Sequence, residues 1–389
     1  MNTSKLIKPA LAFSLASLII AGCSSDSTPT DSTNLEDNDI QTFTVDGIIV
    51  DPYIEGAILC EDLNKDAQCN EDEQLSSSST ANGVFSFDNN LTAGSHIIIK
   101  TQGMHLGKTY DIDISGVVAE DGSIDVVSPL TTFETKGLTT AQIAEILNNA
   151  ASDAGVTWNL NSDDISANPI SSGLLDKTIS EISDEDLLNI QASLSSYGIL
   201  KIMSGSEALS ALSSTELYTS GMQGELYEIS KVMIQNINSS LNTTTLNQIK
   251  AGIEQGKGMM TSYNVPSSMI DAGLPEPTIE LIVKVAVSII DRLAEIGYTT
   301  CNATGGDVTA ALGEVANNQS QITSSAVTLG TQMYGLTYRN EMKNNFTGNY
   351  SAILDGIFAS DSNMQVGYNA GENGYTTIRF DSSNNLVAQ

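Results

Sequence analysis

The run Cys60-Glu-Asp-Leu-Asn-Lys-Asp-Ala-Gln-Cys-Asn-Glu-Asp-Glu73 places oxygen-bearing side chains at regular intervals along a short segment. Counted from Asp62 as position 1, a carboxylate or carboxamide stands at positions 1, 3, 5, 9 and 12, and position 7 can offer its backbone carbonyl. This is the ligand spacing of a twelve-residue calcium loop, whose last Glu binds the ion with both oxygens. The predicted Ca2+ ligands are Asp62, Asn64, Asp66, Gln68, Asn70 and Glu73.

Two features distinguish this loop from the helix–loop–helix version of the motif. Position 6, a Gly in that version, is Ala67 here, and the sharp turn at this position favours a residue with a free φ. The flanking runs 45–50, 56–60 and 83–87 are short and apolar, which is typical of strands. The sequence therefore predicts a calcium loop between strands, and the alternative is a plain acidic turn.

Residues 43–132 are predicted to form a small all-β sandwich domain. Asn-Gly and Asp-Gly turn signals separate short apolar or alternating runs along this region. Strands and turns at this spacing suit two packed antiparallel sheets. The predicted strands span 43–50, 56–61, 83–87, 96–101, 110–118 and 124–128.

The same region resembles a known domain family through the acidic loop and the two runs that flank it. These runs are Val45-Asp-Gly-Ile-Ile-Val-Asp-Pro-Tyr-Ile-Glu-Gly-Ala-Ile-Leu-Cys60 and Ser79-Thr-Ala-Asn-Gly-Val-Phe-Ser-Phe87. Together they are similar to the carboxypeptidase-regulatory-like domain and to the prealbumin-like, calcium-binding B-type repeats of bacterial surface adhesins. Ser79 or Ala81 stands where the family often has Asp. The resemblance covers about a quarter of the chain and implies a non-catalytic spacer, adhesive or accessory module with metal ligands at Asp62, Asn64, Asp66 and Glu73.

The first 42 residues carry the signals of an exported, lipidated protein. Lys5 and Lys8 precede an apolar run over 10–20 that is too short to span a bilayer. The run ends in Leu18-Ile-Ile-Ala-Gly-Cys23, which resembles the bacterial lipobox and implies a signal peptide over 1–22 and a lipid on Cys23. An ordinary secretory peptide is the alternative. Residues 23–42 are rich in Ser, Thr and Asp and are predicted to be a disordered tether.

The residue after the lipobox bears on localisation. Ser24 follows Cys23 where the Gram-negative sorting pattern has Asp for retention at the inner membrane. By resemblance to that pattern, we expect a lipid-anchored protein at the outer membrane. Its folded part is expected at the cell surface, with the periplasmic face as the alternative. Several buried acyl chains would hold it there stably.

Composition excludes nucleic acid as a partner. The formal net charge is −31, and −33 without Lys5 and Lys8 of the predicted signal peptide. So acidic a chain repels nucleic acid and anionic lipid surfaces. Hydrophobic residues make up 40%, which is enough for a packed core. The length that remains after residue 22 suggests two domains.

Cysteine positions predict one disulfide in an oxidising compartment. Cys60 and Cys69 lie at the start and in the middle of the acidic segment, so they are the natural pair. Their bridge would pre-order the metal ligands. Cys301 is then left over, and its pairing with either of the other two is the alternative.

After residue 132 the pattern changes to apolar residues at helical spacing behind capping residues, so 133–343 is predicted to be a helical domain. The tail, 344–389, is predicted to be β-rich, with strands over 349–353, 364–368 and 375–380 and a turn over 371–374. The fold class is therefore α+β and multidomain. The predicted helices span 138–147, 187–197, 213–237, 243–263, 278–296, 305–317 and 320–338, and 161–177 is predicted to be irregular.

Residues with catalytic potential are few. His96 and His105 are the only histidines, and both are interpreted as surface or structural residues. Asp111 and Asp113 share one face of a predicted strand, where they are solvated carboxylates, a second cation site or a glycosidase-like acid pair. The sequence contains no nucleophile elbow, zinc-protease motif or phosphate-binding loop.

Taken together, these patterns favour a non-catalytic binding or structural lipoprotein that serves adhesion or cell-surface assembly. It would bind a protein or polysaccharide partner at the cell surface. Two other classes of function remain open. One is a carboxylate-based hydrolase, or an accessory protein, that acts on extracellular polysaccharide through Asp111 and Asp113. The other is a lipoprotein that captures a small ligand for a transporter.

Overall fold

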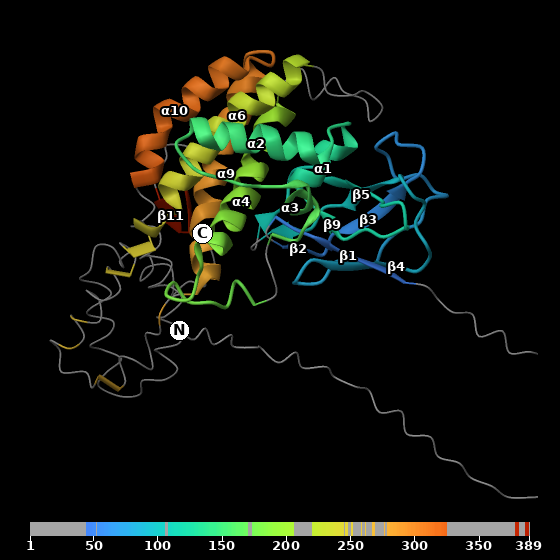
Figure 1. Cartoon of the computed structure of the whole chain (residues 1–389), viewed down its shortest axis with the longest axis horizontal. Coiled ribbons are helices and arrows are strands. Elements are labelled where there is room, and N and C mark those ends of the chain that lie inside the picture. The colour runs from blue at the N-terminus through green and yellow to red at the C-terminus, as the bar shows by residue number, and fades with distance from the viewer. Residues whose placement is uncertain are drawn as a thin grey trace, which may run out of the picture. The chain divides into compact units, whose positions relative to one another are not determined.

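The computed structural model describes residues 44–51, 53–105, 108–169, 173–205, 220–244, 278–324, 378–380 and 386–388, and a few single positions between 246 and 276. Within these ranges the chain is a mixed α+β protein with small sheets and seven helices (Figure 1). The predicted α+β class is therefore confirmed. The predicted signal peptide, Cys23 and the tether lie outside the described residues.

Residues 45–127 form nine short strands in three sheets. The sheet orders are β4-β1-β9, β3-β5-β8 and β2-β6-β7, and every strand pair is antiparallel except β1 with β9. The strands are β1 (Val45–Ile49), β2 (Ile54–Glu55), β3 (Ile58–Asp62), β4 (Val84–Phe87), β5 (His96–Thr101), β6 (Met104–His105), β7 (Lys108–Thr109), β8 (Ser115–Val117) and β9 (Val126–Val127).

Five predicted strands are present as β1, β3, β4, β5 and β9. The sixth, predicted over 110–118, is wrong in its first half, because only Ser115–Val117 is a strand. Residues 110–114 alternate between buried and exposed as predicted, yet they join no ladder. Alternation reports burial of one face, and it does not guarantee a neighbouring strand. The two-residue strands β2, β6 and β7 were too short to predict.

The strands bury an aromatic and aliphatic core. Phe85 and Phe87 are fully buried from β4, with ring centroids 5.9 Å apart in an edge-to-face arrangement. Gly83 brings β4 against β1, since the Ile49 amide donates to its carbonyl at 2.9 Å. A Cβ on Gly83 would lie 2.2 Å from the Ile49 carbonyl oxygen, and its φ is +74°, so only glycine fits this turn.

The segment that joins the strands to the helices is itself a helix, α1 (Pro129–Thr135). Ser128 caps it, and its threonines are buried against β8. Thr131 donates to the Ser115 carbonyl at 2.8 Å, and Thr132 accepts from the Ser115 amide at 2.9 Å. The sequence showed only a join here, because these hydrogen bonds reach a residue far away along the chain.

The remaining helices form a bundle. They are α2 (Thr140–Asp153), α3 (Ser162–Ser166), α4 (Asp184–Ser204), α6 (Ser220–Ser240), α9 (Ile279–Ala303) and α10 (Val308–Ser324). The prediction was wrong at two places: α3 lies in the segment predicted to be irregular, and α10 continues through the break predicted at 317–320. Most of the predicted helix 243–263, and 325–338, lie outside the described residues.

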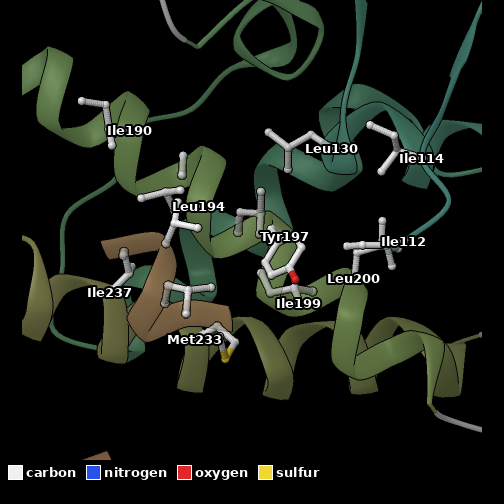
Figure 2. Close-up of a cluster of buried hydrophobic side chains, with 14 of the residues drawn as sticks. Ile112, Ile114, Leu130, Ile190, Leu194, Tyr197, Ile199, Leu200, Met233 and Ile237 are labelled. Carbon is white, nitrogen blue, oxygen red and sulfur yellow. The ribbon is translucent and has the colours of Figure 1, made fainter. Parts of the chain in front are cut away.

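Helix α4 is central to the bundle, because α6, α9 and α1 pack on it while α10 packs on α9. One continuous hydrophobic cluster includes both strand and helix residues. Figure 2 shows Ile112, Ile114 and Leu130 beside Tyr197 and Leu200 of α4. The predicted boundary at residue 132 therefore falls within a shared core, and the division into two domains stays a prediction. Among the described helices, none combines the length and apolar character that crossing a membrane requires.

In the tail, β10 (Ile378–Phe380) pairs antiparallel with β11 (Leu386–Ala388), and β10 packs against α9. The predicted strand 375–380 overlaps β10, whereas β11 was not predicted. The predicted strands 349–353 and 364–368, and the turn 371–374, lie outside the described residues.

We expect Thr132→Val to destabilise the protein by about 1–3 kcal/mol, because it leaves the buried Ser115 amide without its hydrogen-bond acceptor. The change preserves the shape of the side chain. Chemical denaturation of both proteins measures the difference. Thr309→Val, at an exposed position of α10, is the control and should change stability much less. Equal effects of the two substitutions would show that the hydroxyl of Thr132 does not hold α1 on β8.

Candidate metal centre

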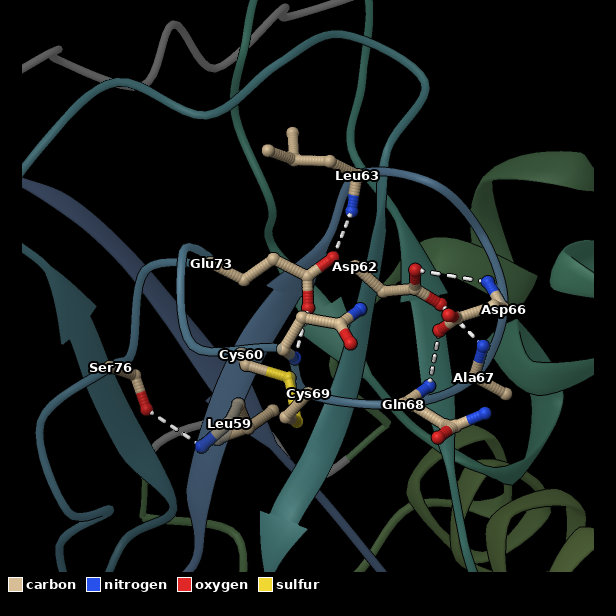
Figure 3. Close-up of a disulfide and its surroundings, with 11 residues drawn as sticks. Leu59, Cys60, Asp62, Leu63, Asp66, Ala67, Gln68, Cys69, Glu73 and Ser76 are labelled. Atoms are coloured by element: carbon tan, nitrogen blue, oxygen red, sulfur yellow. Dashed lines mark hydrogen bonds between the residues drawn. A yellow bond between two sulfur atoms is a disulfide. The ribbon is translucent and has the colours of Figure 1, made fainter.

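The acidic loop leaves β3 and returns alongside it. The Glu61 amide donates to the Gln74 carbonyl at 3.0 Å, and the Ser76 amide donates to the Leu59 carbonyl at 2.9 Å. Ser76 Oγ in turn accepts from the Leu59 amide at 2.9 Å (Figure 3). These bonds close the base of the loop, so residues 62–73 project from a fixed stem.

The predicted disulfide is present. Cys60 in β3 is bonded to Cys69 in the loop (Figure 3). Cys301 of α9 is buried and free. The bridge ties the middle of the loop to its stem. It therefore restricts the loop before any ion binds, which reduces the ordering that binding would require.

The backbone of the loop wraps around the Asp62 carboxylate. Asp62 is fully buried, and its Oδ1 accepts from the Asp66 amide at 3.2 Å while its Oδ2 accepts from the Ala67 amide at 2.8 Å. Two further side chains repeat this pattern on a smaller scale. Asn64 Oδ1 accepts from the Asp66 amide at 3.0 Å, and Asp66 Oδ1 accepts from the Gln68 amide at 2.9 Å. Side-chain oxygens at positions 1, 3 and 5 thus fold the first half of the loop.

Glu73 joins the two halves of the loop. It is 7% exposed, and its Oε1 accepts from the Leu63 amide at 3.0 Å while its Oε2 accepts from the Asn70 amide at 2.8 Å. Both oxygens of the residue at position 12 are therefore directed back into the loop (Figure 3). This is the orientation that a bidentate ligand at this position needs.

The turn at position 6 is made without glycine. Ala67 has φ 60° and Lys65 has φ 59°, both in the left-handed region. An L-residue with a Cβ pays about 1–2 kcal/mol for this conformation. Ala67 stands where the motif has Gly, and it nevertheless adopts the left-handed backbone of a sharp turn at this position.

The donor chemistry of the loop suits a hard divalent cation, because its turn and its oxygen atoms are those of a calcium loop. Each carboxylate oxygen bound to one amide keeps a second lone pair. However, in the part of the chain that the structure describes, no three acidic, histidine or cysteine side chains converge closely enough to hold a metal. Calcium binding by the loop therefore stays a prediction.

Glu61, for which the sequence predicted no role, holds the stem in place. Its Oε1 accepts from Ser95 Oγ at 2.9 Å and from the Thr92 amide, and its Oε2 accepts from Gln74 Nε2 at 2.7 Å. Burial acts to raise the pKa of Glu61, but these hydrogen bonds outweigh it and lower the pKa below its usual value. The sequence offered one signal for this structural role, which is an acidic residue within an otherwise apolar strand.

The histidines are structural rather than surface residues. His96 is buried in β5 directly opposite Asp62, and burial, with Lys65 and Lys136 adding to it, lowers the pKa of His96 to about 4. His105 is buried in β6, where its ring stacks on the ring of Tyr197. Both side chains are therefore part of the core.

Asp111 and Asp113 are both exposed and have different partners. Asp111 forms an ion pair with Lys201 of α4, while Asp113 accepts from Gln102 Nε2 at 2.9 Å. Nothing in these contacts gives the two carboxylates a common target. Their contacts favour the interpretation as separate, solvated carboxylates over a working acid pair.

Comparison of the chain with protein-family models, curated proteins and solved structures yields no match. The resemblance of residues 45–87 to carboxypeptidase-regulatory-like domains therefore stays a prediction.

We expect Ala67→Gly to raise the free energy of unfolding by about 1 kcal/mol, because glycine adopts the left-handed turn without the Cβ penalty. Thermal and chemical denaturation measure the change. Ala81→Gly is the control, since Ala81 is exposed and lies outside the left-handed region, where glycine should destabilise instead. Destabilisation by both substitutions would contradict the strained turn.

We expect Glu61→Gln to destabilise the protein by about 1–3 kcal/mol at pH 7, since charged hydrogen bonds to Thr92, Ser95 and Gln74 are weakened. Because the pKa of Glu61 is lowered in the folded state, its contribution is present above the unfolded pKa of about 4.3 and is lost as the pH falls through the folded value. The difference between the variant and the parent should therefore shrink in acid. Glu71→Gln, exposed in the same loop, is the control.

Proposed function

We propose that the chain is a non-catalytic binding module whose β-region is stabilised by calcium in the loop 62–73. The observation that carries this proposal is the buried Asp62 carboxylate, around which the backbone of a calcium-type loop is already folded. Glu73 at position 12 and the left-handed turn at Ala67 support it. The residues that would hold the ion are Asp62, Asn64, Asp66, Gln68 through its carbonyl, Asn70 and Glu73.

Calcium would supply positive charge where the chain concentrates negative charge. The net charge of the protein is −31, and the carboxylates of Asp62 and Glu73 are both buried in the loop. Binding to the native state alone stabilises it by RT ln(1 + [L]/Kd). For a millimolar site of the extracellular kind, this is roughly 1 kcal/mol at a few millimolar calcium. Calcium would then stabilise the loop chiefly outside the cell.

The proposal extends to the domain organisation of the chain. We infer that residues 43–132 are a carboxypeptidase-regulatory-like β-sandwich joined to a helical domain over 133–343. Two observations support this inference. Residues of this region form the sheets β4-β1-β9 and β3-β5-β8. Phe85 from the first sheet and Leu59 and Ile97 from the second are fully buried in one hydrophobic cluster. A spacer or adhesive module would use such a compact body to present its surface.

The site of action proposed here is the outer membrane, where a lipid on Cys23 would anchor the chain. The partner would be a protein or a polysaccharide at the cell surface. Hydrolysis of a polysaccharide through Asp111 and Asp113 is the weaker hypothesis, because the two residues have separate partners. Ligand capture for a transporter has no specific contact in its favour among the described residues.

We expect calcium to raise the melting temperature of the full chain by roughly 2–4 °C over its value in EGTA, as a stabilisation of about 1 kcal/mol would. The rise should be lost in Asp66→Ala, which removes an exposed ligand side chain and leaves no buried cavity. Asp72→Ala, at an exposed position of the same loop outside the ligand positions, should keep it.

The absence of a calcium effect on the parent protein would overturn the proposed function. A rise that persists in Asp66→Ala would place the calcium elsewhere on this acidic chain. Magnesium at the same concentration is a further control, since it prefers a smaller octahedral site and should stabilise less.

A further inference from the structure

Where the strands meet the helices, five ionisable side chains gather, which we call the junction cluster. Asp51 follows β1, His105 lies in β6, Tyr110 follows β7, Tyr197 belongs to α4 and Asp291 to α9. Tyr110 donates to Asp51 Oδ2 at 2.8 Å, and Tyr197 donates to Asp291. The ring centroids of His105, Tyr110 and Tyr197 lie between 5.8 and 6.2 Å apart. The cluster therefore connects both parts of the structure.

Asp51 is the least compensated member of the cluster. It is 1% exposed, its Oδ2 has the Tyr110 hydroxyl as a donor, and its Oδ1 has no hydrogen-bond partner in the structure. A carboxylate that is buried with so few donors is costly, whereas a neutral carboxyl group is much less so. The geometry thus favours the protonated form.

The charges around Asp51 point the same way. The charged group that acts on Asp51 from α9 is Asp291, which is also acidic. Lys201, a buried cation on α4, forms its ion pairs with Asp111 and Glu295 and lies 5.0 Å from the ring centroid of Tyr298. Its positive charge is thus already balanced. The ionisable groups that join Asp51 in the cluster are two tyrosines, one histidine and one carboxylate.

We propose that Asp51 keeps its proton in the folded protein near neutral pH, and that the junction cluster is a pH-dependent latch between the strands and the helices. The latch is closed while Asp51 is neutral. Loss of the proton places a buried negative charge near the half-buried Asp291 and loosens the packing of His105 and Tyr110 on Tyr197 of α4. The proposal is independent of calcium binding by the loop.

The pKa of Asp51 is shifted upward, as this geometry favours. Burial raises the pKa of Asp51 well above its usual range, the hydrogen bond from Tyr110 opposes the rise, and the charge of Asp291 adds to it. Burial likewise raises the pKa values of Tyr110 and Tyr197, so both remain neutral hydrogen-bond donors. Asp51 is thus the member of the pair with Tyr110 that takes up or releases the proton.

The proton on Asp51 makes the stability of the folded protein depend on pH. The unfolded chain loses the Asp51 proton near pH 4, whereas the folded chain keeps it to a higher pH. Between these two values the folded state binds more protons, so stability falls as the pH rises. For one proton the melting temperature should fall by roughly 3 °C per pH unit in this window.

The test is the melting temperature of the full chain and of Asp51→Asn between pH 5 and 8.5. Asparagine keeps an oxygen that accepts from Tyr110 but cannot ionise. We expect the melting temperature of Asp51→Asn to rise relative to that of the parent by roughly 3 °C per pH unit. This rise should begin above the pKa of Asp51 in the unfolded chain and end at its pKa in the folded chain. Asp113→Asn, an exposed carboxylate near Tyr110 in the chain, should run parallel to the parent. Parallel curves for Asp51→Asn would overturn the proposal.

A second variant covers the case in which Asp51→Asn does not fold. Tyr110→Phe removes the donor that favours the charged carboxylate, so it should extend the pH-dependent window to higher pH. An unchanged window would contradict the latch. Infrared spectroscopy of the folded parent gives a direct readout: a carboxylic-acid C=O stretch at pH 7, lost at high pH, supports a protonated Asp51, and its absence at pH 7 contradicts it.

Discussion

Carboxylates that are buried within reach of backbone amides organise the loop end of this protein. Asp62 is fully buried, so its two oxygens must find hydrogen-bond donors, and the amides of Asp66 and Ala67 are the donors available. That requirement bends the chain into a left-handed turn at Ala67, at a cost that a glycine would have avoided. Glu73 imposes the same constraint on the other half of the loop. The disulfide and the Glu61 contacts then fix the stem on which both halves stand.

Where the strands meet the helices, polar groups also decide how the parts join. The hydroxyls of Thr131 and Thr132 pair with the backbone of Ser115, which sets α1 on β8. The core continues beneath them from the strands into α4, so these hydrogen bonds orient surfaces that are already apolar. Asp51 and its tyrosine partner lie at the same junction, where a single proton changes the balance of charge. The hydrophobic contact holds the strands and the helices together, and the polar groups fix their relative orientation.

The sequence was informative where the signal is local. The spacing from Asp62 to Glu73, the disulfide partners, five of the strands and the starts of α2 and α4 at Thr139 and Ser183 can all be recognised in short windows. It was less informative where contacts are distant. Helix α1 depends on Ser115, β11 is recognisable only by its pairing with β10, and the burial of Asp51 depends on Tyr110, 59 residues away. His105 lies in a strand of two residues between turns, so its buried position had no periodic signal.

The central claim is that the loop 62–73 binds one calcium ion, and an NMR titration of the uniformly labelled chain tests it most directly. The amides of Asp66, Ala67 and Gln68 donate to side chains at the ligand positions, so they report on those side chains. The account predicts that calcium shifts these resonances together and saturably, with one dissociation constant of about the millimolar class. Loop resonances that stay fixed while others move would contradict the claim and leave residues 60–73 as an acidic, disulfide-closed turn.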